Sequence, residues 1–134
     1  MRMLRSAVLA LTLAAVSAPF ARADEPYIDF LEGLRDLRYY EYALLYLDGL
    51  RDDPNVPADV RAVIPYEKAT TLLAKTRSSV IRSPEVQALE LDKALGFLKQ
   101  FTTDSPNHPK AVEANTERAR ILLGRARVEV WQAR

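Results

Sequence analysis

The sequence contains no cysteine, a single histidine and only four glycines, which stand apart from one another. Without cysteine there are no disulfide bonds and no thiolate ligands. Zinc sites need clusters of cysteine and histidine, so His108 alone cannot build one in a monomer. Isolated glycines form no glycine-rich phosphate loop. We therefore predict no metal and no other cofactor, and a fold stabilised by packing alone.

Long hydrophobic runs are also scarce. The apolar run Ala7–Val16 is about half as long as the ~20 residues that a membrane-spanning helix needs. Arg2 and Arg5 precede it, and Ala21-Arg22-Ala23 places small residues where a signal peptidase reads them. This pattern predicts that residues 1–23 are a cleaved secretory signal peptide rather than a membrane anchor. We expect export to the periplasm or cell envelope, without stable membrane insertion after cleavage.

The chain has no strong excess of either charge. Three of its 19 basic residues lie in residues 1–23, which leaves 16 basic against 18 acidic residues in 24–134. A local excess occurs near the end, where Glu129 is the only acid among five arginines: Arg118, Arg120, Arg125, Arg127 and Arg134. These positions follow no single helical stripe, so we interpret them as a solvated face and expect no nucleic-acid partner.

Residues 24–134 show helical periodicity and no alternating strand pattern, which predicts one all-α domain. Ser83-Pro84-Glu85 is typical of a helix start. Pro65 predicts a kink in the helix that contains it. The expected helices span 25–38, 40–53, 57–77, 84–103 and 109–134.

Two segments resemble each other. Ala43–Leu50 and Ala94–Phe101 both begin with Ala-Leu, continue with an aromatic-Leu pair, and end on a large apolar residue. Aspartate and proline follow each of them closely. An alanine allows two helices to approach closely, the large apolar residues fill the next gap, and proline ends a helix, so the two segments read as a repeat of one closely packed helix.

These segments resemble the second helix of a tetratricopeptide repeat. The matching positions are Ala43, Leu47, Leu50 and Pro54, and then Ala94, Leu98, Phe101 and Pro106. Tyr27, Phe30 and Leu34 are similar to the stripe of the first helix, although Leu31 stands where the family has a small residue. Residues 106–111 look like the turn between repeats in exported bacterial proteins of this family. The resemblance implies antiparallel helix pairs stacked as a right-handed solenoid; the alternative is an ordinary helical bundle.

The residue types of a catalytic triad occur together once, in Asp104, Ser105 and His108. They lie within five residues of a proline-bounded turn, where helix capping explains them better than an oriented base with an oxyanion hole. We expect a non-catalytic protein that serves as a scaffold for protein–protein interaction. The alternatives are a structural or assembly subunit of a permanent envelope complex, or an accessory domain of an enzyme.

Aromatic residues supply the candidates for partner binding. Tyr39, Tyr40, Tyr42 and Tyr46 cluster on one helix, where tyrosine suits an interface, and Tyr39, Tyr42 and Tyr46 are the candidates. The alternative, which we favour from the sequence, is that this helix is apolar on two sides because it is buried between neighbours. Trp131 lies in a last helix that has no stop and no capping helix. We expect either the N-terminal part of a longer repeat protein or self-association through this helix.

Overall fold

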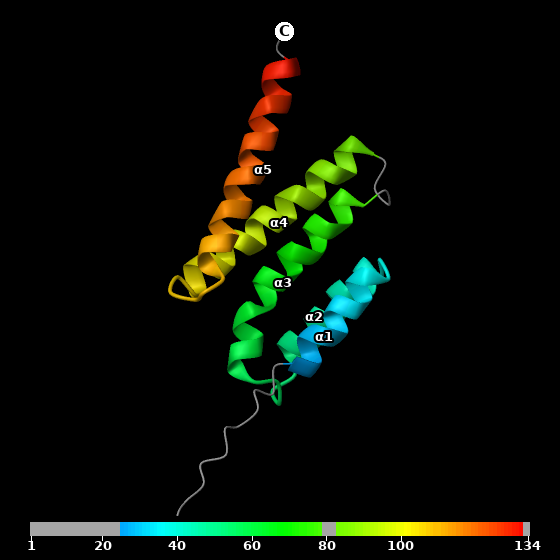
Figure 1. The fold of residues 1–134 in the computed structure, drawn as a ribbon, viewed down its shortest axis with the longest axis vertical. Helices are drawn as coiled ribbons and strands as arrows, with labels where there is room; N and C mark the ends of the chain where they lie inside the picture. The colour runs from blue at the N-terminus through cyan, green and yellow to red at the C-terminus, as the bar shows by residue number, and fades with distance from the viewer. Residues whose placement is uncertain (1–24, 79–82, 133–134) are drawn as a thin grey trace, which may run out of the picture.

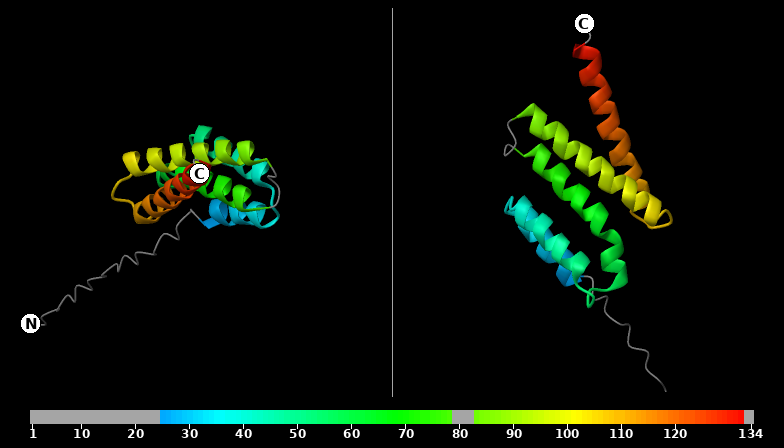
Figure 2. Two further views of the ribbon diagram at one scale, coloured as in Figure 1. Left: turned by 90° about the horizontal axis from the view of Figure 1, so that it is seen from above. Right: turned by 180° about the vertical axis from the view of Figure 1, so that it is seen from behind.

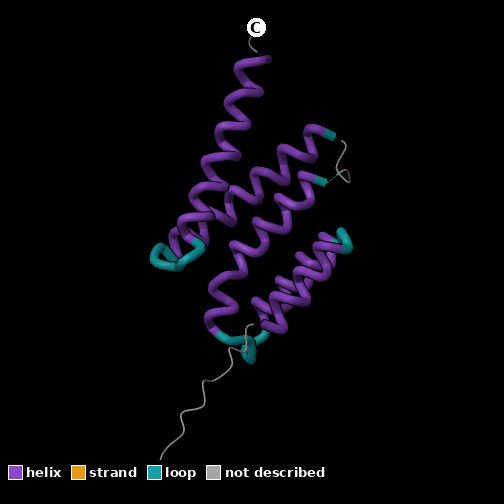
Figure 3. The backbone as a smooth tube through the Cα atoms, viewed as in Figure 1, coloured by secondary structure: helices purple, strands orange, loops and turns teal. Residues whose placement is uncertain are grey.

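The computed structural model describes residues 25–78 and 83–132; for Glu25 and from Arg127 onward it describes the backbone alone. These residues form five α-helices and no strand (Figures 1 and 3). The all-α prediction is therefore confirmed for this part of the chain. The helices are α1 (Glu25–Asp36), α2 (Tyr40–Asp52), α3 (Ala58–Arg77), α4 (Pro84–Asp104) and α5 (Ala111–Gln132).

Helix α3 lies in the middle of the molecule and packs against α1, α2 and α4. It also reaches α5, because Arg77 bonds Glu117 on that helix. Figure 2 shows α2 and α4 on one side of α3 and α1 and α5 on the other. A helix with neighbours on this many sides buries more than one face, so its sequence has no single apolar stripe.

Helix α1 ends at Asp36, two residues before the expected end. Arg38 adopts a positive φ of 60°, and the N–H of Tyr39 donates to the carbonyl of Leu34 at 2.8 Å. This is the hydrogen-bond pattern of a Schellman cap, although glycine usually holds the left-handed position. The tight ending joins α1 to α2 directly and places Tyr39 at the junction.

Helix α3 continues through Pro65 as one helix. Proline cannot donate the hydrogen bond of that position, which favours a bend. The first turns of α3 rise more steeply than the remainder (Figure 1). At the start of α4, Ser83 Oγ accepts a hydrogen bond from the N–H of Val86 and Pro84 occupies the first turn, as the sequence predicts.

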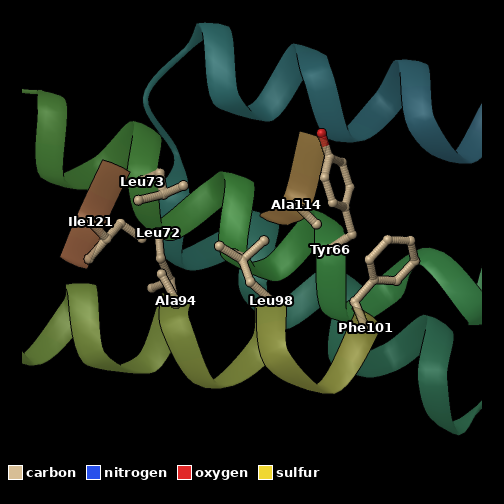
Figure 4. Packing of buried hydrophobic residues seen from close by; sticks show 9 residues of the cluster. Tyr66, Leu72, Leu73, Ala94, Leu98, Phe101, Ala114 and Ile121 are labelled. Atoms are coloured by element: carbon tan, nitrogen blue, oxygen red, sulfur yellow. The ribbon is translucent and has the colours of Figure 1, made fainter. Parts of the chain in front are cut away.

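Two hydrophobic clusters make up the core. One joins α1, α2 and the start of α3 around Leu31, Ala43 and Leu47. The other joins α3, α4 and α5 and includes the fully buried Ala69. Figure 4 shows its labelled side chains gathered between these helices: Tyr66, Leu72, Leu73, Ala94, Leu98, Phe101, Ala114 and Ile121. Ala43 and Ala94 are both fully buried, so each sits at a close helix contact.

Candidate functional site

A group of aromatic and aliphatic side chains lies open to solvent on α1, α2 and the junction between them. Phe30, Tyr39, Tyr42 and Leu45 are each more than half exposed. With Leu34 and Tyr46 they line a shallow hollow of about 660 Å³. We call these six residues the tyrosine surface. Contiguous apolar surface of this kind is uncommon on soluble monomers and usually marks an interaction site.

The interpretation that both apolar sides of α2 are buried is therefore wrong. Tyr40 and Leu47 are buried, on the side that faces the core. Tyr42 and Leu45 are 65% and 68% exposed on the other side. The periodicity shows two apolar ridges, but it cannot show that in the described part of the chain a neighbouring helix covers only one of them.

Two aromatic contacts order the tyrosine surface. Phe30 and Tyr46 meet edge to face, with ring centroids 4.8 Å apart, and so connect α1 to α2. Tyr39 and Tyr42 make a second edge-to-face contact at 6.0 Å. Partial burial, with the Tyr27 phenol nearby, raises the pKa of Tyr46. The phenol is therefore neutral at physiological pH and able to donate a hydrogen bond.

The structure thus brings together the three tyrosines that the sequence proposes. It adds Phe30, Leu34 and Leu45, which sequence reasoning did not assign to a binding surface. Phe30 is 54% exposed, so it does not fill a buried repeat position as the resemblance implies. The sequence does hold a sign of this surface, because Tyr39, Tyr42 and Leu45 are three residues apart and share one helix face.

A second group of side chains joins α3 to its neighbours by ion pairs. Lys68 and Lys75 are seven residues apart on α3 and pair with Asp48 and Glu41, which are seven residues apart on α2. Lys75 also lies 3.5 Å from Glu90 on α4. Burial alone would lower the pKa of Lys75, but the hydrogen bond to Glu41 and the charge of Glu90 raise it. The ammonium group stays charged and holds α2, α3 and α4 together.

Arg35 and Glu67 form a more deeply buried pair between α1 and α3. Their side chains are 12% and 4% exposed, and they meet at 2.8 Å. Arg35 also donates to Thr71 Oγ1 and to the backbone carbonyl of Glu67. Lys110 approaches the second oxygen of Glu67 at 3.2 Å. The sequence analysis missed this cluster, because helical spacing places Arg35 off the apolar stripe and says nothing of a partner on another helix.

These charged groups are already satisfied by one another. Among the described side chains, no buried polar atom lacks a hydrogen-bond partner. The ion pairs therefore connect α3 to its neighbouring helices. Within the same residues, no group of three or more histidine, aspartate or glutamate side chains is placed to hold a metal ion.

Asp104 is the last residue of α4, and Ser105 and His108 lie in the turn that joins α4 to α5. The Nδ1 atom of His108 accepts a hydrogen bond from the N–H of Lys110 at 3.1 Å. Its ring meets Phe101 edge to face, with the centroids 5.3 Å apart. The N–H of Ser105 donates to the carbonyl of Phe101. The His108 side chain therefore orders the backbone just before α5, and the backbone N–H of Ser105 closes the last turn of α4.

Some predicted residues lie elsewhere or outside the described part of the chain. Pro54 and Pro106 are exposed in turns that follow α2 and α4. Trp131 belongs to the end of α5, where only the backbone is described, and residues 1–23 lie outside the described residues. None of the described helices has the length and hydropathy of a membrane span.

Three of the clustered arginines have defined partners. Arg120 pairs with Glu117 on its own helix, Arg125 pairs with Asp92 on α4, and Arg118 donates to Thr102 and Asn115. Two acidic neighbours thus lie close to this arginine group. Such pairing agrees with a solvated, ion-paired face rather than a continuous basic stripe.

No protein-family model matches the chain, and no curated protein or solved structure is significantly similar to it.

Proposed function

We propose that this protein is a non-catalytic scaffold of the bacterial cell envelope that binds a protein or peptide partner through the tyrosine surface. The observation that carries the proposal is the exposure of Phe30, Tyr39, Tyr42 and Leu45 on one face. Aromatic residues are enriched at protein interfaces, and their burial dominates interface energies. The surface is broad and shallow, which suits another protein surface better than a small molecule.

The rigidity of the underlying helices supports the same proposal. Helix α2 is anchored beneath the tyrosine surface by Ala43 and Leu47, and Asp48 and Glu41 pair with Lys68 and Lys75 on α3. Binding to a preorganised surface avoids the entropy cost of ordering it. From α1 to α5, each helix packs against the next one along the chain. This order supports a stack of helix pairs, which we propose to be a right-handed solenoid of tetratricopeptide type.

A permanent structural subunit is the alternative. Obligate interfaces bury about 2,000 Å² or more of mostly apolar surface. Here the exposed apolar residues divide between the α1–α2 end and the α4–α5 end of the stack. This division favours a scaffold with separate contacts over a subunit with one large interface. Export of the chain rests on the sequence pattern of residues 1–23.

The proposal predicts that a double variant, Tyr42→Ala with Leu45→Ala, loses its partner while it keeps its fold. Both side chains are about two-thirds exposed, so we expect the free energy of unfolding to change by less than about 1 kcal/mol. Truncating two interface anchors costs about 2 kcal/mol or more of binding, roughly a thirtyfold loss of affinity. Quantitative affinity enrichment from an envelope extract measures this effect.

The matched control is Val112→Ala with Leu123→Ala, which removes exposed apolar groups from α5. We expect at least one protein whose enrichment is lost with the Tyr42 and Leu45 double variant but kept with this control variant. If both double variants enrich the same proteins as the unmodified chain does, the tyrosine surface is not the binding site.

A further inference from the structure

A groove separate from the tyrosine surface lies where the C-terminal end of α3, the first half of α4 and the second half of α5 meet. Its volume is about 590 Å³. Leu73, Ala88, Leu91 and Ile121 give it an apolar floor. Figure 1 shows α4 and α5 meeting at their shared turn and separating away from it. We call this feature the α4–α5 groove.

The rim of the groove is basic. Arg77, Arg120 and Arg125 line it, and Glu117 is the only acidic residue among the described residues that line it. Arg125 also pairs with Asp92 on α4. Glu117 is shared, because Arg77 and Arg120 both pair with it. Arg77 and Arg120 are each 67% exposed, so their guanidinium groups remain accessible to further acceptors. Arginines whose N–H donors remain accessible at the rim of an apolar groove favour a bound partner that carries carboxylate groups.

The backbone of the groove walls limits the kind of occupant. All three walls are α-helices, whose central N–H and C=O groups are already hydrogen-bonded within each helix. An extended peptide would bury its own backbone groups against apolar side chains without partners, which is unfavourable. A helical peptide satisfies its backbone internally and presents an apolar face, as in helix-in-groove recognition.

The α5 helix of a second copy fits the charge of the groove poorly. The part of α5 after Glu117 carries Arg118, Arg120 and Arg125 and no acidic residue among its described side chains. Docking that helix into the same groove on another copy would bring arginines against arginines. Like charges across an interface oppose binding. The charge therefore favours a helix of acidic character over α5.

We propose that the α4–α5 groove binds an amphipathic helix that has acidic residues flanking its apolar face. This inference deepens the proposed scaffold function by naming the chemistry of one partner, and it rests on that function only in assuming a protein partner. The scaffold would then have two separate binding sites for partners, the tyrosine surface and the α4–α5 groove.

Three labelled synthetic peptides of about 15 residues test the inference by fluorescence anisotropy with the purified protein. The first has leucines at i, i+4, i+7 and i+11 and glutamates beside them. The second replaces the glutamates with lysines, and the third has a proline at the centre of the acidic sequence. We expect the acidic peptide to bind at least tenfold more tightly than either of the others.

Two pairs of variants locate the binding. Gly124 lines the groove, and open space surrounds the position of an added Cβ, as it does at Gly96, which lies on α4 outside the groove. Gly124→Trp should weaken the acidic peptide about tenfold or more, whereas Gly96→Trp should not. Arg120→Glu should also weaken it several-fold, whereas Lys99→Glu, the same charge change elsewhere on the surface, should not.

Several results would overturn the inference. If the lysine peptide binds as tightly as the acidic peptide, charge complementarity does not determine binding. If the proline peptide binds as tightly, the groove does not require a helical partner. Absence of binding, or a dimer of the protein that Gly124→Trp dissociates, also rejects it. Tyr42→Ala should leave peptide binding unchanged. If the peptide fails while a Tyr42-dependent partner is retained, only the groove inference fails and the scaffold function stands.

Discussion

Phe101→Ala is expected to lower the free energy of unfolding by about 4 kcal/mol, which corresponds to a fall of roughly 20 °C in Tm. Phe101 is fully buried in the cluster that joins α3, α4 and α5. Its ring contacts Tyr66 at 5.4 Å and His108 at 5.3 Å between centroids. The substitution therefore leaves a cavity and also removes two aromatic contacts.

Phe30→Ala is the matched control for this experiment, because it deletes the same atoms from a side chain that is 54% exposed. We expect it to cost less than about 1 kcal/mol, mainly through the lost contact with Tyr46. Thermal and urea unfolding followed by circular dichroism measure both variants. Similar losses of stability in the two variants would show that the α4 core is assigned incorrectly.

Glu67→Ala is the second large effect, with an expected loss of about 3 kcal/mol in the free energy of unfolding. The substitution leaves the Arg35 guanidinium group largely buried without its carboxylate partner. It also removes the acceptor for Lys110, whose side chain is 42% exposed and can turn to solvent. The remaining acceptors of Arg35, Thr71 Oγ1 and a backbone carbonyl, keep the loss at the low end for a buried pair.

The control for Glu67→Ala is Glu41→Ala, which removes a carboxylate that is 73% exposed and pairs with Lys75 on the same helix α3. Exposed ion pairs contribute about 1 kcal/mol or less, so we expect a small effect. Urea denaturation at neutral pH compares the two. If Glu41→Ala proves as costly as Glu67→Ala, burial does not decide the strength of these pairs.

Much of the core could be predicted from the sequence. Ala43, Leu47, Ala94 and Leu98 occupy buried positions, because a small residue followed by a large one at helical spacing is a local pattern that packing requires. The start of α4 at Ser83 and Pro84 follows from capping chemistry in the same way. Such features depend on neighbours along the chain, which a sequence displays directly.

The polar surroundings of α3 could not be predicted in this way. Glu67, Lys68 and Thr71 are buried because helices approach α3 from several sides, and their partners on other helices lie 20 or more residues away along the chain. One feature of the sequence does indicate the ion pairs between α2 and α3. Glu41 and Asp48 have the same seven-residue spacing as Lys68 and Lys75 on the antiparallel neighbour. The exposure of Tyr42 and Leu45 likewise depends on which helix covers α2, and periodicity does not contain that information.

Site-specific photo-crosslinking in living cells tests the proposed scaffold function most directly. A photoreactive amino acid replaces Tyr42 on the tyrosine surface or, as the control, the exposed Lys99 on α4. Irradiation of intact cells is followed by fractionation and mass spectrometry of the adducts. We predict a discrete adduct with another envelope protein from position 42, absent from position 99, on a chain that begins at Asp24. No adduct from position 42, or the same adducts from both positions, would contradict partner binding through this surface.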